Sequence, residues 1–269
     1  MKPKKALIVY KKSFYEKHPV FRSLSGIRAS HDRHRRTLRA VKRALRGRGV
    51  RYDAVYRTRE VPYGRYDLII PVGGDGTFLE AARRVGNELM LGVNSDPDHS
   101  VGIFCAATGE TFARVLGRLL DGRARVRCLT RLAVRIGTRA LKQPVLNDVL
   151  FCHRNPAAMS RYWIAAGGRQ EQQRSSGVWV ATAAGSTGGI HSAGGRRMGW
   201  GSRRIQYHPR ELYDASRHRL RGGSAGRVVI CSLMRDGMLY VDGSHRRFKI
   251  PYGGVISVSR SLEPLKIVY

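Results

Sequence analysis

Apolar runs and amphipathic stretches alternate along the first hundred residues of the chain. Residues 30–46 place Leu38, Val41 and Leu45 on one helical face, and Ser30 is in position to cap the helix that this spacing predicts. Short apolar or alternating runs predict strands. The strands predicted in this part of the chain are 5–10, 50–56, 67–72 and 89–93.

Strands and helices are therefore expected to follow one another in turn. Residues 11–30 show no clear period and are expected to form a loop, whereas 78–84 are rich in helix-forming residues and predict a second helix. Alternation of this kind is typical of a mainly parallel sheet covered by helices. We expect residues 1–108 to form a Rossmann-like α/β domain.

A different pattern begins near Arg123, where apolar residues recur mostly at every second position, with arginines between them. Asp236-Gly237 stands between two apolar runs, which is typical of a β-hairpin turn. A helix capped by Thr108 and running to about Leu120 precedes this part. Together these features predict a mostly antiparallel, β-sandwich-like domain at 109–269, whose last strand could pack back on the first domain. Its predicted strands include 145–151, 162–165, 178–181, 228–233, 239–241, 248–250 and 255–258.

The stretch Gly73-Gly74-Asp75-Gly76-Thr77 joins a predicted buried strand to a predicted helix. Glycines let a ligand approach the backbone closely, and the start of a helix offers free N–H groups to a phosphate. A carboxylate in such a cradle repels phosphate, so Asp75 must act otherwise, as a base toward a hydroxyl or as a metal ligand. The alternative is a plain strand–helix turn in which Asp75 caps the helix.

Three further stretches carry polar groups next to predicted strands. Asn94 follows its strand directly, at the sheet edge where ligands of α/β proteins bind. Asn147-Asp148 interrupts an apolar strand, and buried polar groups of this kind meet either backbone partners or a ligand. Residues 181–195 are rich in small and hydroxyl-bearing residues, as expected of backbone lying against a ligand or of a flexible surface loop.

Composition limits the classes of protein. The chain has 269 residues with 50 lysines and arginines against 19 acids, a formal net charge of +31 spread along the whole length. This charge attracts polyanions, but no basic tail with interleaved aromatics indicates specific nucleic-acid binding. The four cysteines show no zinc-ligand spacing. No apolar run is long enough to span a membrane, and the first one is too short for a signal peptide, so we expect a soluble cytoplasmic protein.

Three of these stretches together resemble the NAD kinase family. GGDGT at 73–77, Asn-Asp at 147–148 and TxxGST at 182–187 stand in that family's order and at about its spacing. Features similar to its mitochondrial-type branch are GVNSDPDHSVGIFC at 92–105, SRYWI at 160–164 beside QQRSSG at 172–177, and DGMLYVDGSH at 236–245. The resemblance implies an α/β domain followed by a β-rich domain, and transfer of a phosphoryl group from ATP to the adenosine-ribose 2′-hydroxyl of NAD.

The resemblance also implies roles for individual residues. Asp75 would be the general base on the acceptor hydroxyl, and Mg²⁺ would be bound through the nucleotide phosphates rather than by protein ligands. Phosphate or nucleotide contacts would come from Gly73, Gly74, Gly76, Thr77 and Asn94. The NAD-binding residues would be Asn147, Asp148, Thr182, Ser186, Thr187 and Ser192.

The chain departs from the family pattern at four positions. Ala184 replaces Thr or Ser, Gly189 replaces an aromatic residue, Ser176 stands where many members have Asp, and Asp148 is one methylene shorter than the usual Glu. These changes bear on substrate preference more than on reaction class.

Alternative functions remain open at this point: a kinase with the same glycine turn acting on a lipid or another small hydroxyl compound, and a non-enzymatic polyanion or nucleic-acid binder. Polyphosphate as donor, NADH as acceptor, and a homodimer or higher homo-oligomer are compatible with the family.

Overall fold

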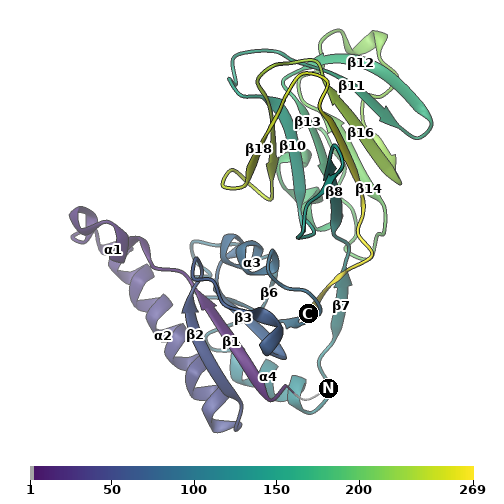
Figure 1. The fold of residues 1–269 in the computed structure, drawn as a ribbon. Helices are drawn as coiled ribbons and strands as arrows, with labels where there is room; N and C mark the ends of the chain where they lie inside the picture. The colour runs from purple at the N-terminus through teal and green to yellow at the C-terminus, as the bar shows by residue number, and fades with distance from the viewer. Residues whose placement is uncertain (1–2) are drawn as a thin grey trace. The chain divides into compact units, whose positions relative to one another are not determined.

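The structure, a computed structural model, describes residues 3–269 and divides into two compact units, each of which is considered by itself (Figure 1). The first unit extends to Cys128 and includes Leu265–Tyr269 from the end of the chain, and the second unit comprises Leu129–Pro264.

The first unit contains both helices and strands. Its helical elements are α1 (Phe14–Lys17), η1 (Pro19–Phe21), α2 (Ser25–Gly47), η2 (Tyr63–Arg65), α3 (Asp75–Ala82) and α4 (Phe112–Leu120). Its strands are β1 (Lys5–Tyr10), β2 (Arg51–Tyr56), β3 (Leu68–Gly73), β4 (Leu89–Met90), β5 (Gly92–Asn94), β6 (Cys105–Thr108), β7 (Val126–Leu129) and β20 (Leu265–Val268).

These strands form one sheet in the order β2-β1-β3-β4-β20-β7, and β5 extends it by pairing with β3 and β6. The pairings of β1 with β2 and β3, of β3 with β4 and β5, and of β5 with β6 are all parallel. β1 and β3 are apolar along nearly their whole length because both faces of the sheet are covered. This is the α/β architecture that the alternating pattern predicts, and the prediction is confirmed.

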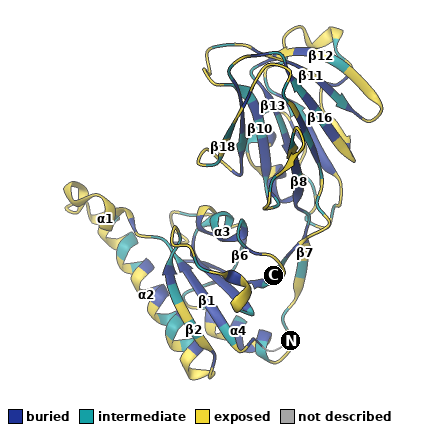
Figure 2. Cartoon of the chain, in the orientation of Figure 1, coloured by how far each residue is buried: buried dark blue, intermediate teal, exposed yellow. Residues whose placement is uncertain are grey.

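One face of the sheet is covered by α2 and α4. Leu38, Val41 and Leu45 of α2 pack with Phe112 and Leu116 of α4 in a single buried cluster. Figure 2 shows the resulting division of α2 into a buried side and an exposed side. On α3, Phe78 is buried and its ring stacks on Phe104 at 5.0 Å between centroids.

The segment 11–30 is not the loop that its lack of period predicts. Ser13 and Glu16 form a capping box at α1, and α2 begins at Ser25. Ser30 is therefore inside α2 rather than its cap, and its hydroxyl donates to Asp96 Oδ2. No pattern predicts the start of the helix, because its first two turns face water and carry no apolar stripe.

Thr108 does not cap α4. The N-cap is Thr111, and Thr108 lies at the end of β6, where its N–H donates to Thr111 Oγ1 at 2.8 Å. The side chain of Thr111 is thus used by the preceding turn and makes no cap hydrogen bond to the helix.

The second unit consists mainly of strands. They are β8 (Leu132–Ile136), β9 (Arg139–Ala140), β10 (Asp148–His153), β11 (Ser160–Ala166), β12 (Arg169–Ser175), β13 (Val178–Ala181), β14 (Ile205–Pro209), β15 (Gly223–Ala225), β16 (Arg227–Ser232), β17 (Gly237–Val241), β18 (Arg247–Ile250) and β19 (Val255–Arg260). Short helical elements are η3 (Ala184–Thr187), α5 (Gly189–Ser192) and η4 (Ala215–Arg217).

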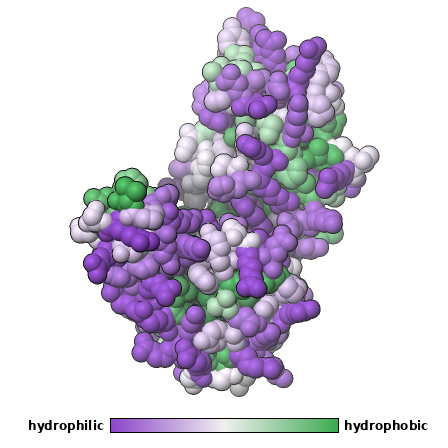
Figure 3. Space-filling model, turned by 60° about the vertical axis from the view of Figure 1, so that its left-hand side comes forward, coloured by the Kyte–Doolittle hydropathy of each residue, from purple (hydrophilic) through white to green (hydrophobic). Residues whose placement is uncertain are grey.

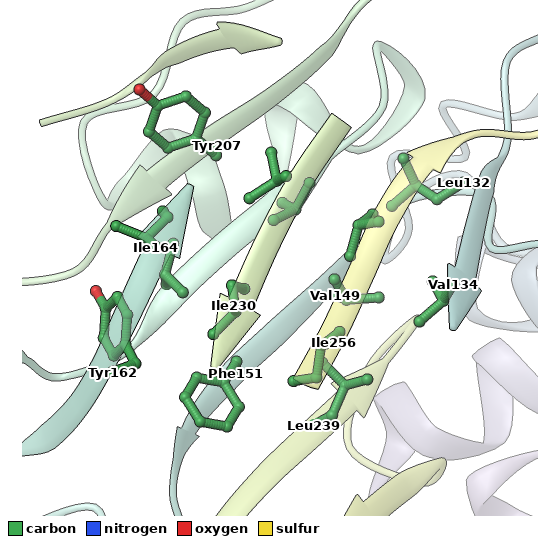
Figure 4. Close-up of a cluster of buried hydrophobic side chains, with 14 of the residues drawn as sticks. Leu132, Val134, Val149, Phe151, Tyr162, Ile164, Tyr207, Ile230, Leu239 and Ile256 are labelled. Atoms are coloured by element: carbon green, nitrogen blue, oxygen red, sulfur yellow. The ribbon is translucent and has the colours of Figure 1, made fainter. Parts of the chain in front are cut away.

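The strands form two six-stranded sheets, in the orders β15-β14-β13-β10-β17-β18 and β12-β11-β16-β19-β8-β9. Pairing is antiparallel throughout the registers of both sheets. Apolar side chains from both sheets share one core, in which Phe151 meets Tyr162 edge-on at 5.9 Å between ring centroids (Figure 4). The prediction of a sandwich-like domain is confirmed.

The prediction of a β-hairpin at Asp236-Gly237 is wrong. β16 pairs with β11 and β19, whereas β17 pairs with β10 and β18 in the other sheet. The connection crosses the sandwich, and its Met234 is buried in the shared core. A turn signal is local and cannot show which sheet the next strand joins.

The first unit ends at Cys128 and the second begins at Leu129, whereas the boundary was expected between residues 108 and 109. The first unit includes α4, which packs against α2, and most of β7. β20 also belongs to the first sheet, where it pairs with β4 in parallel. Among the described residues, no helix is both long and apolar enough to cross a membrane.

Candidate active site

The glycine turn lies at the carboxyl end of β3. Gly73 ends the strand, Gly74 is the extended N-cap residue, and Asp75 is the first residue of α3. Gly73 pairs with Asn94 of β5, so both sit at the same edge of the parallel sheet. Ligands of open α/β sheets bind at this edge, as the sequence predicts for these residues.

The glycines of the turn are required for different reasons. A side chain on Gly73 would collide with Thr77, and one on Gly74 would collide with the hydroxyl of Ser100. Gly76 is exposed, and no atom lies within 4 Å of the position that a Cβ would take. The first two glycines therefore serve the protein's own packing, whereas the open face at Gly76 is free for a ligand.

The carboxylate of Asp75 is held at one oxygen only. Asp75 Oδ1 accepts the Phe104 N–H at 3.0 Å, and Oδ2 has no hydrogen-bond partner within the described part of the chain. Asp75 is thus not the helix cap of the alternative interpretation. Burial, helped by the charge of Asp75, raises the pKa of the neighbouring Cys105 thiol to about 12, so that thiol stays protonated.

Asn94 and Thr77 are used within the protein. Asn94 is buried, its Nδ2 donates to Ser100 O at 2.8 Å, and its Oδ1 accepts the Asp96 N–H at 3.1 Å. Thr77 is buried with its side chain against Gly73. Both residues shape the loop and the turn, and a direct contact with a nucleotide stays a prediction for each.

A polar network that is absent from the sequence predictions anchors this edge to α2. Burial would raise the pKa of Asp96, but hydrogen bonds from Ser30, Arg33 and His99 outweigh it and hold that pKa below its usual value. The SDPDH run after β5 was the available signal, because so many polar residues beside a buried strand require partners.

A buried histidine extends the network to the glycine turn. His34 of α2 contacts Ser95 Oγ at 2.8 Å and Lys11 O at 2.9 Å, and the Ser95 N–H donates to Gly73 O at 3.2 Å. Burial, followed by the charge of Lys11, lowers the pKa of His34 to about 4, so the ring is neutral at pH 7. A neutral buried ring with two partners is a structural residue.

In the second unit, Asn147 and Asp148 lie where β10 begins. Asp242 Oδ1 accepts the Asn147 N–H at 2.7 Å and Asp242 Oδ2 accepts the Leu146 N–H at 3.1 Å. Burial, followed by the charge of Asp242, raises the pKa of Asp148 to about 7. Asp242 itself has a left-handed backbone with φ 47°, and it is not among the predicted site residues.

The side chain of Asn147 carries an unmet acceptor. Its Oδ1 is buried and has no hydrogen-bond partner among the described residues. A buried carbonyl oxygen without a partner is rare in native proteins and suits a site that a ligand completes.

The segment 182–192 packs on this pair. Thr182 Oγ1 donates to Leu146 O at 2.6 Å, and its N–H donates to Asn147 O at 2.9 Å. Gly185 lies directly on the backbone of Asn147, where no side chain would fit. Ser186 Oγ donates to Ala183 O at 2.7 Å, so it is also used within the turn.

Two of the predicted hydroxyls remain exposed. Thr187 and Ser192 are at the surface, and their side chains make no hydrogen bond within the described chain. Among the predicted hydroxyl-bearing residues, these two are free for a ligand, in addition to the unmet Oδ1 of Asn147. The departure at Gly189 has a packing reason, because the ring of Trp179 occupies the space next to its Cα.

The first unit's fold and turn define a class of protein. A carboxylate with one free oxygen, set among glycines at the end of a parallel strand and the start of a helix, is the arrangement of a nucleotide-dependent phosphotransferase.

Comparison with known proteins narrows this class. Residues 26–137 match the family model of the diacylglycerol kinase catalytic domain. The chain is 32% identical over 263 residues to "Probable NADH kinase" from Oryza sativa subsp. japonica, covering 87% of this chain and 81% of that protein. It is 34% identical over 109 residues to "NAD kinase 2, mitochondrial" from Mus musculus, covering 38% and 24%.

The fold comparison agrees. The crystal structure of an NAD kinase from Archaeoglobus fulgidus in complex with ATP superposes with a TM-score of 0.75 at 20% identity, covering 98% of this chain and 93% of that one. The chain belongs to the NAD kinase family, as the resemblance of its three motifs implies.

Proposed function

We propose that the protein transfers the γ-phosphoryl group of ATP to the adenosine-ribose 2′-hydroxyl of NAD or NADH. The observation that carries the proposal is Asp75, whose Oδ1 is fixed by the Phe104 N–H while its Oδ2 is free, beside the open face of Gly76. The name of the rice relative and the ATP complex of the archaeal NAD kinase support these substrates.

Asp75 acts as the general base. A sugar hydroxyl is a poor nucleophile, and a carboxylate oxygen that accepts its proton as the phosphoryl group arrives accelerates attack by about 10²–10⁴-fold. The hydrogen bond to Phe104 fixes the carboxylate, so the free oxygen needs little reorganisation. The N–H groups at the start of α3 stabilise charge on the phosphates.

Magnesium accompanies the donor. The ion would be carried by the phosphate oxygens of the donor. The described residues contain no cluster of three His, Cys, Asp or Glu side chains that could hold a metal ion. When bound, Mg²⁺ neutralises charge on the transferred group. Asp75 is the carboxylate of the turn that could reach the ion, and Asp96 is already engaged by Ser30, Arg33 and His99.

The second unit would bind the dinucleotide. Asn147 Oδ1 offers a buried acceptor for an amide or hydroxyl donor, and Asp148 is partly protonated near pH 7, so it can accept from or donate to a ribose hydroxyl. Thr187 and Ser192 add exposed hydroxyls. Polyphosphate as an alternative donor, a cytoplasmic location and a homo-oligomeric state belong to the proposal as further predictions.

The decisive experiment measures NADP(H) formation by the purified chain from NAD or NADH with ATP or polyphosphate and Mg²⁺. Asp75→Asn keeps the hydrogen bond to Phe104 but cannot accept a proton. We expect kcat to fall by at least about 100-fold with an unchanged circular dichroism spectrum. Full activity in the folded variant would rule out the base role.

A parallel screen covers the lipid alternative, which is motivated by the match of residues 26–137 to the diacylglycerol kinase model. Labelled ATP is offered with diacylglycerol, with other small alcohols and with NAD. Phosphorylation of a lipid in preference to NAD or NADH would contradict the proposed acceptor.

A further inference from the structure

A groove with a volume of about 780 Å³ lies beside α2 in the first unit. One wall is α2, and the other is formed by the turns that follow β5 and β6. The Asp75 carboxylate does not line it, and the proposed phosphoryl transfer does not use it. Its residues are Arg33, Arg36, Thr37, Arg39, Ala40, Arg43, Ser95, Pro97, Asp98, Thr108, Gly109 and Glu110.

Four arginines line the α2 wall. Their spacing of three, three and four residues keeps them along one side of the helix, and at 1.5 Å per residue Arg33 and Arg43 are about 15 Å apart along its axis. Figure 3 shows one face of the molecule, on which hydrophilic residues cover most of the surface and hydrophobic residues gather in a few patches. The groove thus carries a row of guanidinium groups rather than a single one.

Most of this positive charge is not neutralised by the protein. Arg33 pairs with Asp96 at 2.8 Å and with Asp98 at 3.0 Å. Arg36, Arg39 and Arg43 are exposed and have no ion pair or hydrogen bond within the described chain. Two acidic residues line the groove, and one of them, Asp98, forms an ion pair with Arg33. Only the exposed Glu110 therefore remains to offset the charge of the other three arginines.

The floor is closely packed and polar. Gly109 lies directly on the buried Thr37, where a Cβ would be 2.7 Å from its hydroxyl oxygen. Ser95 is fixed through His34 and Gly73. The shape of the groove is therefore set by packed backbone, and its open side carries the exposed, charged ends of the arginines.

We propose that this groove binds a linear chain of phosphate groups, at a site separate from Asp75. A row of guanidinium groups matches the repeated charge and paired oxygens of such a chain. A compact anion could meet only part of the row. The ligand could be inorganic polyphosphate or the phosphate tail of a nucleotide, and both share this chemistry.

Calorimetric titration of the full chain with inorganic tripolyphosphate, and separately with ATP, tests the site at an ionic strength of about 0.15 M. The test variant is Arg36→Gln/Arg39→Gln/Arg43→Gln. The matched control is Arg28→Gln/Arg35→Gln/Arg46→Gln, which removes three exposed arginines of α2 that do not line the groove. We expect the test variant to lose at least tenfold in tripolyphosphate affinity and the control to lose less than twofold.

Several results would overturn the proposal. Equal losses in the two variants would mean that only the overall charge matters, and no measurable binding by the wild-type chain would also reject it. Tighter, groove-dependent binding of single-stranded DNA would assign the groove to nucleic acid instead. Within the proposal, a larger loss of affinity for ATP than for tripolyphosphate in the test variant would identify the phosphate tail of a nucleotide as the source.

An activity measurement separates this site from the proposed catalytic one. The test variant should form NADP(H) at the wild-type rate under saturating ATP. A loss of turnover in proportion to the loss of tripolyphosphate binding would make the groove the donor site and contradict a separate one. If the wild-type chain formed no NADP(H) but bound tripolyphosphate through the groove, only the proposed function would fail.

Discussion

At the scale of single residues, the carboxylates differ in how the fold treats them. Asp96 is held ionised by hydrogen bonds from three side chains, whereas Asp148 is buried next to Asp242 and its pKa rises to about 7. Asp242 in turn accepts two backbone N–H groups and holds the start of β10 in place. The sequence named Asp148 as a site residue but could not show its protonation, which depends on a partner far along the chain.

Asp148 should make the stability of the second unit depend on pH. Its pKa is about 7 in the folded chain and 3.8 ordinarily, so between about pH 4 and pH 7 the folded form keeps a proton that the unfolded form releases. The free energy of unfolding should therefore fall as pH rises through this window, by roughly 1.4 kcal/mol for each unit of pKa difference. Asp148→Asn should remove this fall.

Tryptophan fluorescence follows the unfolding of the second unit selectively, because the three tryptophans of the chain all lie in it: Trp163, Trp179 and Trp200. Urea unfolding of the wild type and of Asp148→Asn is compared at pH 4.5, 6 and 8. Parallel pH curves for the two proteins would show that Asp148 ionises normally.

At the scale of elements, the start of α3 and the body of α2 illustrate what local pattern can predict. The strand–turn–helix unit around Asp75 follows from its apolar run, its glycines and its helix formers, and the structure has it with boundaries shifted by only a few residues. Leu38, Val41 and Leu45 predict the body of α2, but nothing predicts its start, because residues 25–29 face water and carry no apolar stripe. The bonds from Ser30 and Arg33 to Asp96 are equally hidden, since Asp96 lies too far along the chain to be read from local pattern.

Gly76→Ala tests whether the start of α3 is kept open for a ligand. The variant should fold normally, since nothing lies within 4 Å of the new Cβ and alanine favours a helix by up to about 1 kcal/mol. If phosphates approach this face, the KM for ATP should rise at least tenfold. An unchanged KM would place the phosphates elsewhere.

Gly74→Ala, two residues earlier in the same turn, is the matched control. Its Cβ would collide with the hydroxyl of Ser100, so this variant should lose stability and not only activity. Thermal unfolding followed by circular dichroism distinguishes the two cases, and equal stability of both variants would contradict the packing argument.

At the scale of the whole molecule, the chain returns to its first unit at its end. β20 pairs in parallel with β4 in the first sheet, and Leu265, Ile267 and Val268 are buried there. The formal charge of +31 belongs to the whole chain, but only the fold gathers part of it into a groove on α2. Charge count alone did not indicate any particular surface.

Ile267→Ala should destabilise the first unit from the far end of the chain. Removing a fully buried Ile side chain costs about 2–5 kcal/mol. The long helices α2, α3 and α4 are all in the first unit, so the circular dichroism transition should move to lower urea while the tryptophan transition stays. Lys266→Ala, whose side chain reaches Asn87 at the surface, is the control and should move neither.

The sequence by itself determined the two architectures, the glycine turn with Asp75, the Asn147-Asp148 pair and the family, because these depend on short-range period and on residues close together in the chain. Only the tertiary structure decided that β16 and β17 enter different sheets, that Asp242 lies beside Asp148, and that arginines of α2 line a groove with the turns after β5 and β6. Each of these depends on contacts between distant segments, and such contacts are selected by the packing of whole faces rather than by any local run of residues.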